Sequence, residues 1–467
     1  MIPATQQAVQ LVGPDKLSLN TSKPVHRPGA RQILGKVECV GLCQSDMKLL
    51  HQFDQHARKS PVLAHVGTDV LKQIPSYVPD AAPTVPGHEV VIRVEEVGAG
   101  VTSVEVGKRY LVQADWRELK TAGSNGAFGY NFEGGLQEYV LLDERITVAG
   151  DGTSYLVPVD ERRGASATAL VEPWACVEQA FIHRERTTLM PGGALLLVDS
   201  AGKADLDGVD LALPKTKQCL GKCTPQAGFT CVDAAQLKPG SITDLIYVGA
   251  DADELERLLP LISKEGMLVV LTGGAQFARP VSLPVGRVHY GNVRIVGYPG
   301  NALAKALARI PETGEVRAGD HVHVVGAAGP MGSMAVIRLV SIAGQDLSVE
   351  ASDMAGDRLE VLRRKAEPVA QKRGTKLRSD GFIDQPGAVG TARRTLDAHR
   401  HVTVIRFDVK RELGAARALN LDVHDQGFGL SKITFVGNAS LKAARAGLGW
   451  IEPSQNRKLP PYLWWLL

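Results

Sequence analysis

The chain has 467 residues, of which 44% are hydrophobic and 22% are charged, and it contains 49 Gly and 26 Pro. This composition is typical of a globular protein with many turns and excludes extensive disorder. The length favours about two to four domains. Lys and Arg number 53 against 50 Asp and Glu, and no basic stretch is interleaved with aromatics, so nucleic acid is not an expected partner.

No apolar run reaches the roughly 18 residues that span a bilayer, and residues 1–16 lack the basic start and apolar stretch of a secretion signal. We therefore expect a cytoplasmic protein with no membrane partner. In a reducing compartment a thiol is buried, catalytic or a metal ligand. The six cysteines are at positions 39, 43, 176, 219, 223 and 231.

Short β segments separated by Gly and Pro predict an all-β body with long loops from Gln32 to about Leu142. Residues 165–181 are apolar on most faces and predict a buried helix. The rhythm then changes to that of an α/β unit. It has apolar strands at 193–199, 242–249, 267–274 and 292–303, with a helix at 252–266 that ends at a glycine.

The same rhythm starts again at His321, with strands near 347–353, 401–409 and 432–441. The segment RIVGYPGNAL (294–303) resembles ITFVGNASL (433–441), about 140 residues later. This likeness predicts a duplicated α/β unit. The alternative is a chance similarity of two apolar strands that end in glycine.

A glycine loop follows the first strand of the second unit. Gly326, Gly329 and Gly332, with Pro330 and Met331 between the last two, lead into an apolar helix. A dinucleotide pyrophosphate needs this arrangement, because glycines let the backbone approach and the helix N-terminus supplies free N–H groups. The first glycine is displaced by one position from G-x-G-x-x-G.

The next strand ends at Asp353, 21 residues after Gly332, close to where an acidic group binds the adenosine ribose. This position favours NAD over NADP. Glu350 is a competing candidate, and a solvated acid after the strand is the structural alternative. In the first unit the corresponding strand is followed by Asp199 and a single glycine, Gly202, which predicts a degenerate copy with a structural role.

Zinc chemistry on an alcohol needs three ligands of N, S or carboxylate type and one open position. Cys43 follows a strand in VGLCQSD, His88 and Glu89 open another strand in VPGHEVV, and Glu172 lies in VEPWACVE. Each of these residues alone has a structural explanation, as a buried thiol, a hydrogen-bonded histidine or a helix acid.

In this order, ahead of a dinucleotide fold, the motifs together resemble the medium-chain zinc-dependent alcohol and polyol dehydrogenases over about residues 30–445. The resemblance implies an α/β protein with a GroES-like β-rich catalytic domain and Rossmann-type doubly wound units, the first degenerate. The implied boundaries are 1–185 for the catalytic zinc domain, 190–305 for the degenerate unit, 318–445 for the NAD-binding unit and 446–467 for a C-terminal tail.

The resemblance also assigns the metal. It makes Cys43, His88 and Glu89 ligands or near-ligands of one catalytic Zn²⁺. Glu172 becomes a fourth acidic group that reaches the metal directly or through water, as in the sorbitol dehydrogenase branch.

The expected catalytic residues are Ser45, Asp46 and Glu89. By resemblance, Ser45 is the hydroxyl nearest the substrate oxygen, and it passes a proton outward. Asp46 is a partner of a ligand, the histidine above all.

The implied activity is zinc-dependent transfer of a hydride from a secondary alcohol, a polyol or a sugar-derived alcohol, to NAD. The expected assembly is a homo-oligomer, a dimer or a tetramer. One alternative is a zinc-free quinone-reductase-like enzyme that uses NADPH, against which Cys43, His88 and Glu172 argue together. A second alternative is a nucleotide-binding sensor without catalysis, which a complete ligand set disfavours.

Two departures from the family pattern concern the catalytic domain. The lobe with four closely spaced cysteines for a structural zinc is absent, so one zinc is expected. Cys43 and His88 are 45 residues apart, which indicates an insertion, residues 51–85, that could line the substrate mouth. We expect surface or structural roles for its three histidines, at positions 51, 56 and 65.

Three of the six cysteines lie in the first α/β unit. Cys219, Cys223 and Cys231 lack the C-x-x-C spacing and a fourth ligand, so we expect thiols in a surface loop rather than a second metal site.

Overall fold

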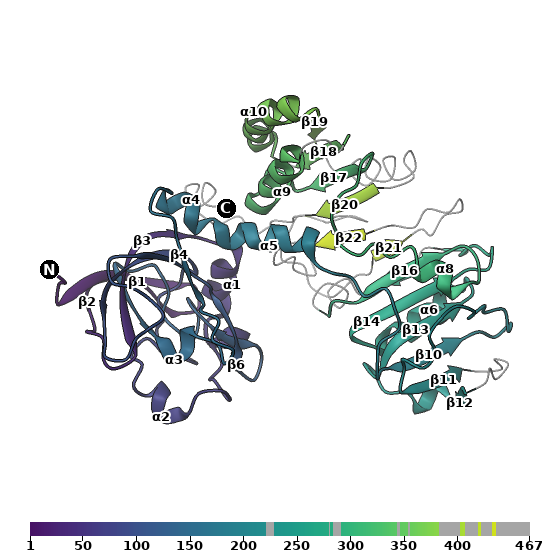
Figure 1. The fold of residues 1–467 in the computed structure, drawn as a ribbon, viewed down its shortest axis with the longest axis horizontal. Coiled ribbons are helices and arrows are strands. Elements are labelled where there is room, and N and C mark those ends of the chain that lie inside the picture. Colours follow the sequence, from purple (N-terminus) through teal and green to yellow (C-terminus); the bar gives the residue numbers. More distant parts are fainter. Residues whose placement is uncertain are drawn as a thin grey trace. The chain divides into compact units, whose positions relative to one another are not determined.

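The chain forms two compact units, one of Met1–Ala175 and one that begins at Cys176. Figure 1 shows both in the computed structural model, and each is described by itself. The structure describes residues 1–220, 228–279, 281–283, 291–342, 346–353 and 355–382, and the strands at 402–406, 419–421 and 432–435.

The first unit is built on a five-stranded antiparallel sheet. Its strands, in spatial order, are β8 (Tyr139–Asp143), β3 (Gln32–Gly41), β4 (Glu89–Val97), β5 (Arg109–Val112) and β9 (Leu156–Pro158). The β segments predicted between residues 32 and 142 correspond to four of its strands, β3, β4, β5 and β8. Fully buried Ile33, Val90 and Ile92 form part of the core on this sheet. Two hairpins join it, β1 (Thr5–Gly13) with β2 (Lys16–Pro24) and β6 (Asp115–Lys120) with β7 (Asn125–Ala127).

Short helices fill the connections of the first unit. They are α1 (Gln44–Gln52), η1 (Phe53–Gln55), η2 (Ala57–Lys59), α2 (Thr68–Leu71), α3 (Glu144–Thr147) and α4 (Ala165–Ala169). Helix α5 (Val171–Ile182) begins in the first unit and ends in the second. The helix predicted at 165–181 is confirmed in part, because α4 and α5 cover the segment, but the helix breaks at Leu170, and Leu170 and Val171 are exposed. Pro173 has no N–H to donate and fits best in a first helical turn, so α5 starts anew just before it.

The second unit contains a six-stranded parallel sheet. In spatial order its strands are β12 (Thr230–Val232), β11 (Thr216–Leu220), β10 (Ala194–Val198), β13 (Ile242–Val248), β14 (Ile262–Leu271) and β16 (Arg294–Tyr298). This is the 3-2-1-4-5-6 order of the doubly wound dinucleotide fold. The helices that connect or follow the strands of this sheet are η3 (Ala234–Gln236), α6 (Ala252–Leu258), η4 (Leu259–Leu261) and α8 (Leu303–Leu307).

The helix predicted at 252–266 ends earlier than expected. The α-helical part stops at Leu258, and β14 already begins at Ile262. Pro260 cannot continue the backbone ladder of the helix, so it ends the helix ahead of the glycine that was taken as the stop.

A second parallel sheet follows in the same unit. Its strands, in spatial order, are β19 (Lys376–Phe382), β18 (Ser348–Asp353), β17 (His321–Val325), β20 (Val402–Arg406) and β22 (Lys432–Phe435). Its order, 3-2-1-4-5, matches that of the first sheet over five strands, and its helices are α9 (Pro330–Ser341) and α10 (Gly356–Arg373). A short pair, β15 (Val281–Leu283) with β21 (Leu419–Leu421), completes the strands. Both sheets are thus of Rossmann type, whereas the proposed duplication stays a prediction.

The first strands of the two sheets lead into different structures. In the second sheet β17 leads through the glycine loop directly into α9. In the first sheet the described residues between β10 and β11, 199–215, contain no helix. The first sheet therefore lacks, in its described residues 199–215, a helix N-terminus at the place where a Rossmann fold binds pyrophosphate.

The cysteines of the first sheet are placed differently from the prediction. Cys219 is buried in β11, and Cys231 is exposed in β12, its partner in the strand register, with the two Sγ atoms 3.1 Å apart. The expected surface loop is therefore wrong for these two residues, because β11 extends through Cys219 and β12 contains Cys231. Cys223 lies outside the described residues.

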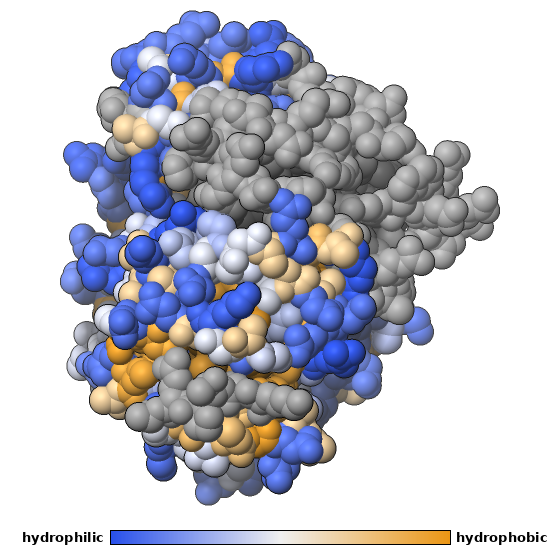
Figure 2. Space-filling model, turned by 90° about the vertical axis from the view of Figure 1, so that its right-hand side faces the viewer, coloured by the Kyte–Doolittle hydropathy of each residue, from blue (hydrophilic) through white to orange (hydrophobic). Residues whose placement is uncertain are grey.

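Figure 2 shows one face of the molecule, on which hydrophilic residues cover most of the described surface and apolar residues gather in the lower part of the view. None of the helices in the described part of the chain combines the length and apolar character that crossing a bilayer requires.

Candidate metal centre

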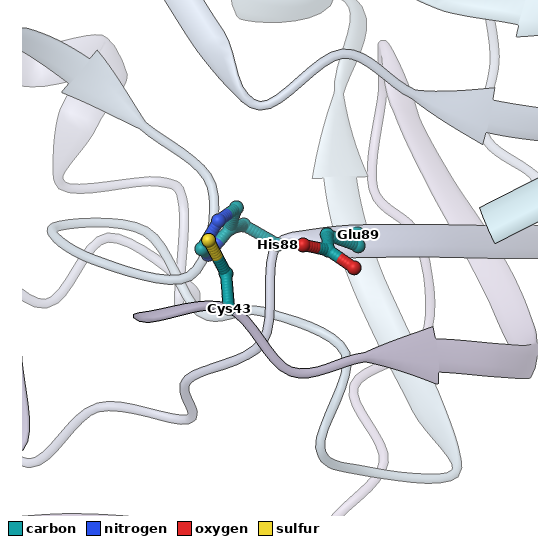
Figure 3. Close-up of side chains that lie close together, drawn as sticks. All are labelled: Cys43, His88 and Glu89. Atoms are coloured by element: carbon teal, nitrogen blue, oxygen red, sulfur yellow. The ribbon is translucent and has the colours of Figure 1, made fainter. Parts of the chain in front are cut away.

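Two adjacent strand ends bring the predicted ligands together. Strand β3 ends at Gly41, and Cys43 is the N-cap residue of α1. Strand β4 begins at Glu89 and pairs with β3 so that Gly41 lies opposite Glu89. The antiparallel register therefore places the two motifs beside each other, although 45 residues separate Cys43 from His88 (Figure 3).

Cys43, His88 and Glu89 form a group that could hold a metal ion. Their ligand atoms, a thiol sulfur, an imidazole nitrogen and a carboxylate oxygen, all lie within 4.8 Å of one another. His88 and Glu89 are buried, and Cys43 is partly buried. Thiolate, imidazole and carboxylate are the donors that zinc takes in catalytic sites with three protein ligands. The residues present therefore fit a zinc ion.

Asp46 orients the histidine. One of its carboxylate oxygens, Oδ1, is 3.1 Å from Nδ1 of His88 and accepts a hydrogen bond of 3.1 Å from the backbone N–H of Gly87. The other, Oδ2, accepts a bond of 2.8 Å from the backbone N–H of Cys43. With the Nδ1 proton directed at this carboxylate, Nε2 keeps the lone pair that a metal requires.

Ser45 lies beside the two ligand atoms. Its hydroxyl is 3.1 Å from Sγ of Cys43 and 3.3 Å from Nε2 of His88. The sequence predicts this hydroxyl nearest to the substrate oxygen, and the structure places it beside two of the three candidate ligand atoms.

The acidic residues of the centre repel one another. Burial raises the pKa of Glu89 to about 7; the charge of His88 lowers it, while that of Glu172 raises it. Burial also raises the pKa of the Glu172 carboxyl, although the charges of His88 and Arg58 oppose this effect. Burial opposes the charged form of His88, but the charges of Asp46 and Tyr130 and the hydrogen bonds to Asp46 and Cys43 together outweigh it and raise the pKa of His88. A cation among these groups would relieve the repulsion between the acids.

Glu172 stands apart from the ligand group. Among the described residues, the group that could hold a metal contains Glu89 and not Glu172. Its charge nevertheless acts on Glu89. Of the two acids predicted as ligands, Glu89 is therefore the better placed for direct contact.

The sequence reasoning missed two residues of the centre. A Cβ atom on Gly41 would lie 2.1 Å from Oε2 of Glu89, so this glycine makes room for the carboxylate. The buried ring of Tyr130 has its centroid 5.5 Å from that of His88 and 5.1 Å from that of His56. Gly41 is recognised only from its place opposite Glu89 in the strand register, which the sequence does not show. Nothing in the local sequence marked Tyr130.

The three histidines of the insertion each have a neighbour in the structure, and the surface or structural roles expected for them stay a prediction. His51 pairs with Asp15, and His65 lies 3.2 Å from a carboxylate oxygen of Glu118. His56 is buried against Tyr130, and burial together with nearby positive charges lowers its pKa to about 4.

The glycine loop of the second sheet has the backbone that a dinucleotide site requires. Gly326 has a φ of 77°, which a side chain would strain. A Cβ atom on Gly332 would lie 2.2 Å from the carbonyl oxygen of Gly326, so α9 packs this close to the loop only with glycine there. Gly329 is the N-cap of α9, and Pro330 and Met331 form its first turn.

Asp353 ends β18 beside this loop. Its carboxylate accepts hydrogen bonds of 2.9 Å from the backbone N–H groups of Ala328 and Ala355, and it lies 3.9 Å from the guanidinium of Arg358. Glu350 lies within the same strand. Contact with the loop favours Asp353 over Glu350 as the acid nearest a bound cofactor.

The comparisons with known proteins bear on the first unit. Residues 29–151 match the family described as the alcohol dehydrogenase GroES-like domain. This segment contains Cys43, His88 and Glu89 and ends before Glu172. No curated protein matches the chain.

Solved structures show weak overall similarity. Butanediol dehydrogenase from Bacillus subtilis is 18% identical, with 69% of this chain and 92% of that chain covered and a TM-score of 0.31. A thermostable alcohol dehydrogenase from Pyrobaculum aerophilum is 17% identical, with 72% and 94% covered and a TM-score of 0.28. D-arabinose dehydrogenase from Sulfolobus solfataricus is 14% identical, with 65% and 92% covered and a TM-score of 0.27. At these scores the similarities support no inference about activity.

We predict that Cys43→Ser removes most of the bound zinc. The purified protein should carry about one zinc per chain, and the variant should lose most of it because a hydroxyl is a poor zinc ligand. Elemental analysis after dialysis measures the content. Cys39→Ser is the matched control, since Cys39 lies four residues earlier in β3 and outside the ligand group. Equal zinc in both variants would contradict the assignment.

The two acids can be separated in the same way. Glu89→Gln should lower the affinity for zinc about 10- to 100-fold, and Glu172→Gln should lower it less, because only Glu89 lies in the ligand group. Competition with a chromogenic chelator measures both affinities. A larger loss in Glu172→Gln would show that Glu172 is the direct ligand.

Proposed function

We propose that the protein is a zinc-dependent oxidoreductase that transfers a hydride from a secondary alcohol, a polyol or sugar-derived alcohol, to NAD. The observation that carries the proposal is the meeting of Cys43, His88 and Glu89 inside the segment that matches an alcohol dehydrogenase domain. A homo-oligomeric state and a cytoplasmic location remain expectations from the sequence.

The residues of the centre would divide the work. Cys43, His88 and Glu89 would hold the metal, and Asp46 would keep His88 in the tautomer that binds it. Bound zinc supplies Lewis-acid chemistry, which makes an alcohol more acidic and easier to oxidise. The hydroxyl of Ser45, which lies beside two of these ligand atoms, would take the proton of the substrate hydroxyl while it releases its own proton outward to solvent.

The loop of the second sheet would hold the cofactor. Gly326, Gly329 and Gly332 leave the backbone open, and the N-terminus of α9 offers N–H groups and a positive dipole to the pyrophosphate. Asp353 would bind the adenosine ribose. The cofactor itself accepts the hydride, and the protein would position its nicotinamide ring.

The alternatives make different predictions about metal. A quinone-reductase-like enzyme would work without zinc and with NADPH, and a sensor would bind nucleotide without turnover. The test is a panel of polyols and sugar alcohols with NAD and NADP, before and after removal of metal. We expect NAD-linked oxidation that a chelator abolishes and added zinc restores. Quinone reduction that survives the chelator, or nucleotide binding without any turnover, would overturn the proposal.

Cofactor choice tests Asp353. The wild-type protein should prefer NAD, because an anionic carboxylate repels a 2′-phosphate. Asp353→Asn should narrow the preference by about tenfold, since it removes the charge and frees Arg358, 3.9 Å away, for the phosphate. The ratio of kcat/KM for NAD and NADP measures this. Asp357→Asn, an exposed neighbour at the start of α10, is the control.

Stoichiometry distinguishes the two sheets. We predict one dinucleotide per chain, because only the loop of the second sheet leads into a helix. Gly329→Asn should abolish binding by placing a side chain where the pyrophosphate approaches. Gly202→Asn should leave it intact, since Asn tolerates the φ of 64° at that position. Calorimetric titration that finds two equivalent sites would contradict this assignment.

A further inference from the structure

Arg58 lies beside the centre although it belongs to the insertion. It is in η2, and its guanidinium carbon is 5.3 Å from the centroid of the Tyr130 ring. The same ring has His88 at 5.5 Å. One aromatic side chain therefore separates the guanidinium from a candidate metal ligand.

The charge of Arg58 acts within the centre. Burial raises the pKa of Tyr130, and the charges of His88 and Arg58 both lower it. The guanidinium also lowers the pKa of Glu172, which comes from α5. Residues on two separate segments thus feel this cation, so its position near the centre does not depend on the ring contact alone.

The described residues use little of the hydrogen-bonding capacity of the Arg58 guanidinium. Its only ion pair in the described part of the chain is with Asp115, at 3.8 Å, which is longer than a hydrogen bond. Asp115 is shared with Arg117, also at 3.8 Å, and accepts a hydrogen bond from Asn125. Arg58 is about one-third exposed and can offer a planar fork of N–H donors to a ligand.

A second cation acts on a neighbour of Tyr130. The charges of Lys48, on α1, and Arg58 both lower the pKa of His56, whose ring lies 5.1 Å from that of Tyr130. With its pKa at about 4, His56 adds no positive charge of its own near neutral pH.

We infer that Arg58 binds an anionic group of the substrate, a carboxylate or a phosphate, at the end of the molecule away from the alcohol carbon that is oxidised. The inference rests on the proposed function and names its substrate class. A guanidinium binds either anion through two parallel hydrogen bonds. The face of Tyr130 holds the fork in place through a cation–π contact.

The test compares D-sorbitol with two charged relatives, D-sorbitol 6-phosphate and D-gluconate. Initial rates with NAD and calorimetric binding are measured for the wild type, Arg58→Met and Arg117→Met. The wild type should prefer at least one charged compound. Arg58→Met should reduce that preference about 10- to 100-fold, mainly through KM. Arg117→Met is the matched control, because it also removes a partner of Asp115 but lies on exposed β6 surface.

The outcomes separate the two proposals. A preference for the phosphate or for gluconate identifies which anion is bound. Two outcomes overturn the role of Arg58 and leave the proposed function standing. One is oxidation of D-sorbitol with no preference for either charged compound. The other is an equal loss of that preference in Arg58→Met and Arg117→Met. Charged compounds that bind through Arg58 without oxidation of any alcohol overturn the proposed function and support the anion site. Absence of binding by both charged compounds overturns the inference.

Discussion

The buried carboxylate of Asp46 holds together the two segments that carry the candidate ligands. It receives the backbone N–H of Cys43 on one side, and the N–H of Gly87 and Nδ1 of His88 on the other. A buried carboxylate is costly unless hydrogen bonds satisfy it, and here three groups do so. The same bonds that compensate for its burial fix the end of β3, the start of β4 and the orientation of the imidazole.

This dependence explains why spacing along the chain matters little for the centre. Residues 51–85, the predicted insertion, lie between Cys43 and His88, yet the register of β3 and β4 places the two strand ends side by side. The insertion has internal hydrogen bonds of its own, since buried Lys59 donates to the carbonyl oxygens of Val78 and Ala82. The position of the ligands therefore depends on the strand register rather than on the length of this segment.

The sequence predicted most strands of the three large sheets, though not β9, β11, β12 and β19, and it marked the candidate ligand motifs. Both depend on local patterns: apolar runs between turn residues, and short motifs at strand ends. The sequence was insufficient where contacts join distant segments. Tyr130 meets His56 and His88 only in the folded chain. The hairpin of β1 and β2 was missed because β2 is mostly exposed and shows little apolar pattern. The helix at 252–266 was extended too far because periodicity was followed past Pro260.

The two Rossmann-type sheets show that strand order and nucleotide binding have separate physical causes. Order follows from apolar strands such as β10 and β17, which are buried in the middle of their sheets. Binding requires free backbone N–H groups at the end of the first strand. After β10, the carboxylate of buried Asp199 accepts a hydrogen bond of 2.7 Å from the backbone N–H of Ala204. This N–H group of the loop is therefore not free to bind a phosphate. The first sheet can therefore keep the fold while presenting a carboxylate where a phosphate would bind.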